Sequence, residues 1–254
     1  MASPFDSPAF NDRLFFPRKD ATPVPEGAQD GWVEVPDGRL HFRWHRSPGT
    51  RIVLLHFHGN GEVVSDYDDL APAFARCGAQ LLAVDYRGYG LSEGTPTLRA
   101  LIGDARAVAR WAAARSPLPL GVYGRSLGSA CAAELLGDPT TPITRGIWES
   151  GFSDLRGLVA RRGLPPPAAV TPEDRAAFDP LPKLARATVP VLVLHGEQDE
   201  HLDPAESRRA FEACGSAERR FVLVPGRGHN DLGASPATWQ ALADFLGGQK
   251  VPGE

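Results

Sequence analysis

The sequence predicts an α/β fold: a mostly parallel central sheet with an N-terminal antiparallel hairpin, helices on both faces and a short cap insertion. Two observations lead to this expectation. Short apolar runs without polar alternation, typical of strands buried on both faces of a parallel sheet, recur and alternate with helical patterns. Before them, two segments of alternating apolar residues flank an Asp-Gly turn, which indicates a hairpin.

The length and composition are those of one globular domain. At 254 residues and 42% hydrophobic content, the chain can bury a core without disulfides. Three distant cysteines with no CxxC pair favour a reducing compartment, and we expect a cytoplasmic protein. A net charge of −4 argues against a nucleic-acid partner. No apolar stretch approaches the ~20 residues that span a bilayer, so we expect no stable membrane insertion.

The elements follow in chain order. Residues 1–30 lack a period and are interpreted as an irregular lead-in whose Phe10, Leu14, Phe15 and Phe16 lie on the surface of the domain. Residues 31–254 form the domain, which begins with hairpin strands around residues 36–39. The predicted buried strands are residues 52–57, 80–85, 120–123, 146–148, 191–195 and 220–224. The predicted helices are residues 63–77, 98–115, 127–136, 204–214 and 236–246.

One connection between strands, at about residues 151–187, is too long for a simple loop. It contains three consecutive prolines, 165–167, and we interpret it as a small cap. Acyl pockets are lined by such caps and by loops after the strands. We therefore expect Phe152 and Leu155 of the cap, together with His201 of a later loop, to contact substrate. The alternative for the apolar cap residues is that they simply cover the core of the domain.

The sharpest chemical signal is a G-x-S-x-G motif at residues 124–128. An apolar strand leads into it and a helix of small residues follows it. In such a strand-to-helix turn the serine takes a strained backbone conformation, and side chains at the two glycine positions would collide with neighbouring elements. The motif therefore predicts Ser126 as a nucleophile that projects above the sheet.

A serine nucleophile needs a base, and His229 follows the last predicted strand, in a loop that reaches the same sheet edge as Ser126. Asp199, after the preceding strand, is the acid we expect to orient that imidazole. Glu149, just after another strand, is an alternative acid. His195 ends a strand, where a ring more often braces the turn.

A tetrahedral oxyanion also needs donors. Leu127 follows the nucleophile, and its backbone N–H is one candidate. The loop after the strand at residues 52–57 reads His-Phe-His-Gly-Asn-Gly, where Gly59 lets the backbone approach and the N–H of Asn60 is the second candidate.

Five motifs together resemble an α/β-hydrolase. They are Gly-Arg-Ser-Leu-Gly at 124–128, His-Gly-Asn at 58–60, Asp-Tyr-Arg-Gly-Tyr-Gly-Leu-Ser at 85–92, His-Gly-Glu-Gln-Asp at 195–199 and Gly-His-Asn at 228–230. Within that superfamily the sequence is similar to the small-cap serine hydrolases of the α/β-hydrolase domain-containing group, which includes protein-depalmitoylating thioesterases. The resemblance implies the α/β-hydrolase fold and the roles given above to Ser126, Asp199, His229, Asn60 and Leu127. The sequence departs from the eukaryotic depalmitoylating members in having no cysteine before Cys77.

These residues predict a serine hydrolase that cleaves a small-molecule carboxylic ester or thioester through an acyl-enzyme on Ser126, with no cofactor and no metal. Two alternatives stay open. One is a non-catalytic binding protein with the same fold. The other is a metal-dependent hydrolase that uses His56 and His58, although Asn60 and Gly61 stand where binuclear hydrolases carry Asp-His.

Overall fold

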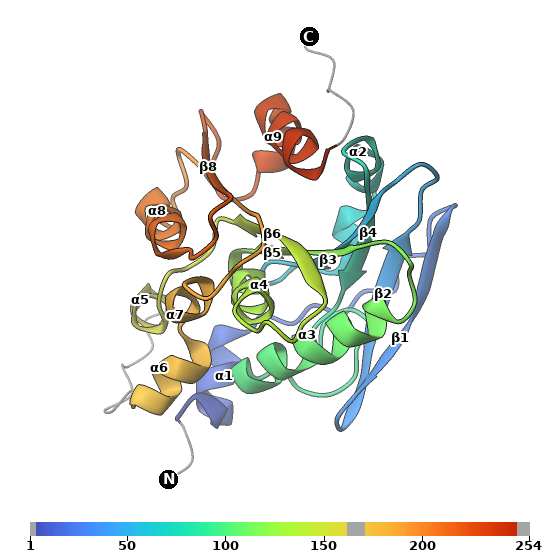
Figure 1. Cartoon of the computed structure of the whole chain (residues 1–254). Coiled ribbons are helices and arrows are strands. Elements are labelled where there is room, and N and C mark those ends of the chain that lie inside the picture. The colour runs from blue at the N-terminus through green and yellow to red at the C-terminus, as the bar shows by residue number, and fades with distance from the viewer. Residues whose placement is uncertain (1–3, 162–170, 248–254) are drawn as a thin grey trace.

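The computed structural model describes residues 4–161 and 171–247, and its centre is an eight-stranded sheet with the order β1-β2-β4-β3-β5-β6-β7-β8 (Figure 1). The hairpin pair β1–β2 and the pair β2–β4 are antiparallel, and the remaining pairs are parallel. The predicted fold class is therefore confirmed. The strands are β1 (Ala28–Val35), β2 (Gly38–His45), β3 (Ile52–Phe57), β4 (Ala79–Val84), β5 (Leu120–Arg125), β6 (Ile143–Glu149), β7 (Val191–Gly196) and β8 (Arg219–Val224).

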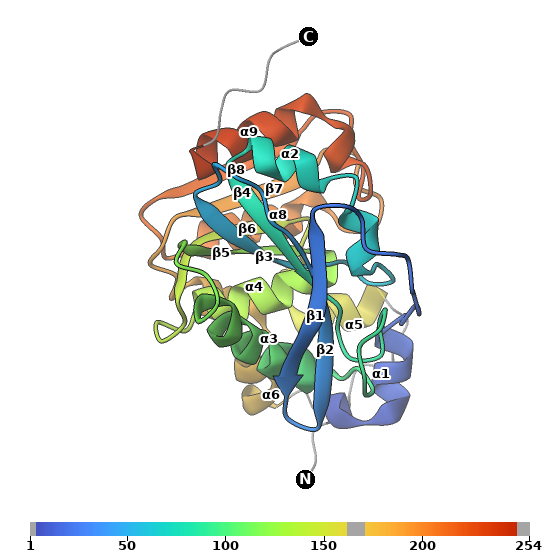
Figure 2. The same cartoon turned by 90° about the vertical axis from the view of Figure 1, so that its right-hand side faces the viewer.

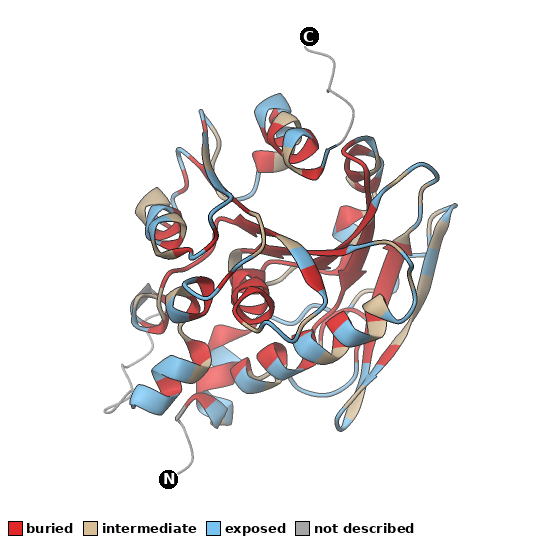
Figure 3. Ribbon diagram, in the orientation of Figure 1, coloured by how far each residue is buried: buried red, intermediate tan, exposed pale blue. Residues whose placement is uncertain are grey.

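Helices cover both faces of the sheet. In the view of Figure 2, α2 (Ala71–Arg76) and α9 (Pro236–Leu246) lie above it, and α3 (Leu98–Ala113) and α4 (Ser129–Leu136) lie below. The helix α8 (Pro204–Ala213) packs against β7 and β8. Figure 3 shows the buried residues concentrated in the sheet and on the inward faces of these helices.

Strand β3 shows why the predicted strands lack polar alternation. Every residue of β3 is buried. Val53, Leu55 and Phe57 belong to one core cluster, whereas Ile52 and Leu54 belong to the other. Because successive side chains of a strand point to opposite faces, both faces must be apolar when both are covered.

The helix predicted over residues 63–77 is instead divided. A 3-10 turn, η2 (Val64–Tyr67), precedes the short α2. Pro72 lies in the first turn of α2. Proline cannot donate a backbone hydrogen bond and its ring clashes with the preceding turn, so a helix can begin there but cannot run through it.

The N-terminal lead-in is not irregular throughout, because it contains η1 (Pro4–Asp6) and α1 (Pro8–Leu14). The hydroxyl of Ser7 caps α1 by accepting a hydrogen bond from the N–H of Phe10. Phe10, Leu14 and Phe15 are buried in the core rather than on the surface. All three belong to the same core cluster. The segment is too short to show a regular apolar period, so the sequence did not reveal this. Phe16 alone of the four is exposed, at 49%.

The cap region contains α5 (Leu155–Arg161), α6 (Pro172–Phe178) and α7 (Pro180–Leu184). The proline triplet at residues 165–167 lies outside the described residues. Leu155 is fully buried in the core. Among the helices of the described ranges, none combines the length and the apolar character that crossing a membrane requires.

Candidate active site

The turn between β5 and the 3-10 helix η3 (Ser126–Gly128) holds Ser126 in a left-handed conformation, with φ of 50°. The motif glycines allow this close packing. A Cβ at Gly124 would lie 2.4 Å from the carbonyl oxygen of Gly128, and a Cβ at Gly128 would lie 2.0 Å from that of Phe57. Backbone atoms cannot move aside cheaply, so the two positions require glycine.

The structure brings three predicted side chains together at the carboxyl edge of the sheet. The Nε2 of His229 lies 3.0 Å from the Oγ of Ser126, and its Nδ1 lies 2.7 Å from the Oδ2 of Asp199. Ser126 follows β5, Asp199 follows β7 and His229 follows β8. Because the ends of parallel strands meet at one edge, residues far apart in sequence form this hydrogen-bonded series.

Asp199 is held as a carboxylate by donors on both oxygens. Its Oδ1 accepts hydrogen bonds from the backbone N–H groups of His201 and Leu202, both at 2.8 Å. Its Oδ2 lies 3.0 Å from the Nε2 of His195 in addition to its contact with His229. Burial acts to raise the pKa of Asp199, but the hydrogen bonds from His195, His229 and Leu202 outweigh it and hold that pKa far below its usual value.

Glu149, the alternative acid, forms hydrogen bonds with residues other than His229. It accepts hydrogen bonds from the hydroxyl of Tyr123 and, at 3.1 Å, from the Nε of Arg125. Arg125 also pairs with Glu62 and donates from Nη2 to the backbone carbonyl of His229 at 2.7 Å. Arg125, the residue before Ser126, therefore holds the loop that carries His229.

The two candidate oxyanion donors, Asn60 and Leu127, line the same cavity as Ser126. The side chain of Asn60 anchors the N-terminal segment: its Oδ1 accepts from the N–H of Phe16 at 2.9 Å, and its Nδ2 donates to the carbonyl of Leu14 at 2.6 Å. The hydroxyl of Tyr89 donates to the same Oδ1 at 2.6 Å. Leu14, the last residue of α1, and Phe16 thus become part of the candidate site.

The cavity over Ser126 has a volume of about 310 Å³. Phe152 and His201 line it, as the sequence predicts, and the imidazoles of His201 and His229 meet edge to face with centroids 5.2 Å apart. Leu155 does not line it. That prediction was wrong because Leu155, the first residue of α5, turns into the core. The apolar lining comes from Leu14, Phe16, Leu127, Phe152, Leu158 and Leu202.

Comparison with known proteins matches this sequence to the family described as serine aminopeptidase, S33, over residues 48–168 and 175–233. The match covers most of the chain, including Ser126, Asp199 and His229. The chain belongs to this family of α/β-hydrolases. It is therefore a hydrolase of the α/β-hydrolase superfamily.

Relatives are similar over most of this chain. An uncharacterized protein of Mycobacterium tuberculosis strain H37Rv is 33% identical over 235 residues, which are 86% of this chain and 79% of that protein. Human alpha/beta hydrolase domain-containing protein 17C is 30% identical over 230 residues, which cover 83% of this chain and 63% of the human protein. The Pyrococcus furiosus esterase Pf2001 superimposes with a TM-score of 0.74 at 20% identity, covering 92% and 98% of the two chains, and shares the fold.

His56 and His58, the proposed ligands of the metal-dependent alternative, contact different residues. The His56 ring packs against Tyr67 and Tyr123, whereas the Nδ1 of His58 contacts the carbonyl of Gly59 and its ring packs against Tyr86. Within residues 4–161 and 171–247, no three His, Cys, Asp or Glu side chains gather in a way that could hold a metal ion.

His195 braces its turn as expected, with Nδ1 at 2.6 Å from the Ser207 hydroxyl and Nε2 at 2.9 Å from the Leu202 carbonyl. Sequence reasoning missed the Arg125 contacts and the attachment of the N-terminal segment to Asn60. The arginine inside the serine motif was a signal for the first. The second had none beyond the apolar residues at 10–16.

Replacing Gly128 with Ala tests the steric requirement at the turn. We expect Gly128→Ala to lower the free energy of unfolding by at least about 3 kcal/mol, because the new Cβ meets rigid backbone. Gly103 is the matched control: it lies inside α3 with nothing within 4 Å of an added Cβ, so Gly103→Ala should stabilise by about 0.5–1 kcal/mol. Urea unfolding measures both, and equal effects would contradict the steric argument.

His56 makes stability depend on pH. Burial lowers the pKa of His56 from 6.5 to about 3. Between these values the unfolded chain binds a proton that the folded protein does not, so stability falls as pH falls. We expect His56→Leu to remove about 1.4 kcal/mol per pH unit from the slope of unfolding free energy against pH in this window. Denaturant unfolding at several pH values measures it, and parallel curves for the two proteins would refute the assignment.

Proposed function

We propose that this protein is a serine hydrolase that cleaves carboxylic esters or thioesters through an acyl-enzyme on Ser126. The observation that carries the proposal is the unbroken series from the Ser126 hydroxyl through both nitrogens of His229 to Asp199. A serine hydroxyl is a weak nucleophile alone, and this arrangement supplies both the base and the carboxylate that orients it.

The chemistry follows from the positions of the groups. His229 Nε2 takes the proton of Ser126 as its Oγ attacks the acyl carbonyl, and Asp199 stabilises the imidazolium. The backbone N–H groups of Asn60 and Leu127 are the proposed donors to the tetrahedral oxyanion. His229 then gives the proton to the departing alcohol or thiol. Water repeats the sequence on the acyl-enzyme and releases the acid.

The cavity suits an uncharged acyl group rather than the free amine of an aminopeptidase substrate. Glu62 is the one acidic residue among the cavity's described lining. It is already bound by Arg125, by the N–H of Gly59 at 2.6 Å and by the hydroxyl of Tyr67 at 2.5 Å. A substrate ammonium group would have to displace these partners, whereas an acyl chain meets the apolar side chains directly.

Covalent labelling tests the nucleophile. A fluorophosphonate probe should label the wild-type protein at Ser126, and Ser126→Ala should abolish both labelling and hydrolysis of p-nitrophenyl butyrate. Ser129→Ala is the matched control: Ser129 lies three residues away, and its buried hydroxyl has no hydrogen-bond partner among the described residues. It should keep labelling. Retained labelling in Ser126→Ala would end the proposal.

Phe16 tests the acyl side of the site. The small cavity predicts a higher kcat/KM for p-nitrophenyl butyrate than for the palmitate ester. Because the half-exposed Phe16 ring forms part of the wall, Phe16→Ala should raise kcat/KM for the octanoate relative to the butyrate ester. Val24→Ala removes another exposed apolar side chain outside the cavity lining and should leave the ratio unchanged. An unchanged ratio in Phe16→Ala would place the acyl chain elsewhere.

A further inference from the structure

A second cavity, of about 590 Å³, adjoins the catalytic one. Asn60, Glu62, Arg125 and Asn230 line both cavities, so these four residues form a partition between them. The far side is built from the ends of β3, β5 and β6 together with η2, α2, η4 (Leu232–Ala234) and α9. Ser126 and His229 line only the catalytic cavity, and the proposed hydrolysis makes no use of the second.

Aromatic side chains form part of the walls of the second cavity. Tyr67, Phe74, Tyr123 and Trp239 all line it. The Phe74 ring meets those of Trp239 and Tyr123 edge to face, with centroids 5.1 Å and 5.7 Å apart. Aromatic rings attract organic cations through their quadrupoles, and more strongly where water is excluded.

The charges of the lining are unbalanced toward negative. The described lining contains the carboxylates of Glu62, Asp66, Glu149 and Asp231 and a single guanidinium, that of Arg125. Glu62 of the partition and Glu149 of the second cavity share this one guanidinium, which leaves an excess of negative charge in the lining of the second cavity. Asp66 and Asp231 pair with arginines outside the lining, at 2.5 Å and 3.5 Å.

Two buried polar groups of the lining have no hydrogen-bond partner among the described residues. They are the imidazole of His56, at both ring nitrogens, and the hydroxyl of Thr238. His56 is 1% exposed and Thr238 is 2% exposed. Buried polar atoms in folded proteins are nearly always hydrogen-bonded. The imidazole is uncharged at neutral pH because burial lowers its pKa to about 3, so it does not offset the carboxylates.

We propose that this second cavity binds a small organic cation, a substituted ammonium group that also carries a hydroxyl. The cationic head lies among the aromatic rings and offsets the excess carboxylate charge, and the hydroxyl pairs with Thr238 or His56. An anion is disfavoured because Glu62 and Glu149 share a single guanidinium. A neutral molecule of the same shape gains the apolar contact but leaves the excess negative charge of the lining uncompensated.

Choline and its uncharged isostere 3,3-dimethylbutan-1-ol test this directly. The reporter is the indole N–H resonance of Trp239 in ¹⁵N-labelled protein, assigned with Trp239→Phe. This N–H donates to the carbonyl of Gly233, and both residues line the cavity. Choline should shift the resonance saturably, with an affinity about tenfold or more above that of the isostere. Equal affinities, or no response to choline, overturn the proposal.

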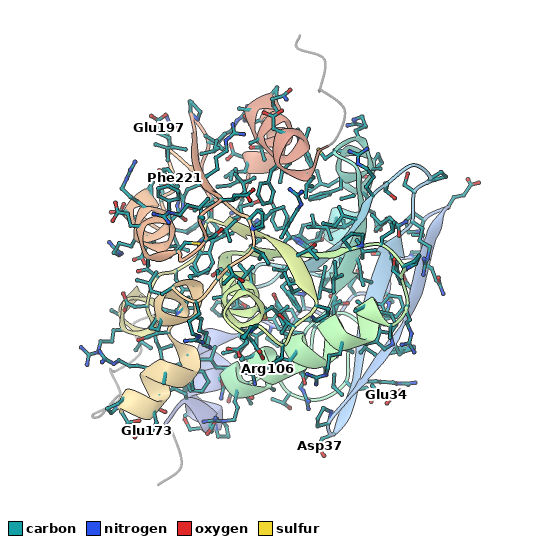
Figure 4. The ribbon with its side chains drawn as sticks, viewed as in Figure 1. Glu34, Asp37, Arg106, Glu173, Glu197 and Phe221 are labelled. Carbon is teal, nitrogen blue, oxygen red and sulfur yellow. The ribbon has the colours of Figure 1, made fainter. Side chains whose placement is uncertain are left out.

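Substitutions locate the charge and the rings. Glu149→Gln removes one carboxylate and should weaken choline binding about tenfold. Glu34→Gln is the matched control on an exposed side chain of β1, at the outer edge of the molecule in Figure 4, and should bind as the wild type does. Phe74→Leu should also weaken choline binding. With two variants, the test still holds if one of them does not fold. Unchanged affinity in both cavity variants overturns the assignment.

A final comparison separates the two cavities. Choline binding should survive phosphonylation of Ser126, because that residue does not line the second cavity. Loss of binding on phosphonylation would mean that choline occupies the catalytic cavity, and it would overturn the proposal. If Ser126 takes no label, the proposed hydrolysis fails while the choline and isostere titrations still decide the cation site.

Discussion

The candidate active site depends on the contacts that the guanidinium of Arg125 makes. This guanidinium joins Glu62 of the loop after β3, Glu149 at the end of β6 and the backbone carbonyl of His229. Burial opposes the charge, but the two carboxylates raise the pKa of Arg125 and keep it protonated. If one partner moved away, a buried charge would be left unpaired, which is costly. The two carboxylates and the loop that carries His229 therefore keep their positions around Arg125. The position of this guanidinium also favours glycine at residue 59, because a Cβ there would lie 2.5 Å from the Nη1 of Arg125.

Next to this network, the backbone of Ser126 is strained. A non-glycine residue with φ of 50° costs on the order of 1–3 kcal/mol and persists only where its surroundings fix it. Here strand β5 fixes the residue before it and the packing permitted by Gly124 and Gly128 fixes the residues around it. Because Arg125 precedes Ser126 in the chain and its side chain holds the His229 carbonyl, one residue positions both Ser126 and His229.

The sequence predicted those features of the fold and of the candidate site that depend on local pattern and on the order of the elements along the chain. Apolar runs predicted the strands, and loops after consecutive parallel strands predicted that Ser126, Asp199 and His229 would meet. It was uninformative where contacts join distant segments without a shared motif. Asn60 binds Phe16, 44 positions away, and Arg125 binds Asn230, 105 positions away. No periodicity encodes such pairs, so the sequence underrated the N-terminal segment. It also left two interpretations of the apolar cap residues, substrate contact or cover of the core, and could not tell that Leu155 packs in the core.

The partition gives its two sides opposite chemistry. On the serine side Glu62 already pairs with Arg125, Gly59 and Tyr67, which supports the proposed uncharged acyl group. On the other side Glu62 and Glu149 share one guanidinium, which supports the proposed cation. A cation beside Glu149 competes with Arg125 for that carboxylate, and Arg125 is the group that holds the carbonyl of His229. Arg125 therefore contacts groups on both sides of the partition: Glu149 in the second cavity and the carbonyl of His229 beside the first.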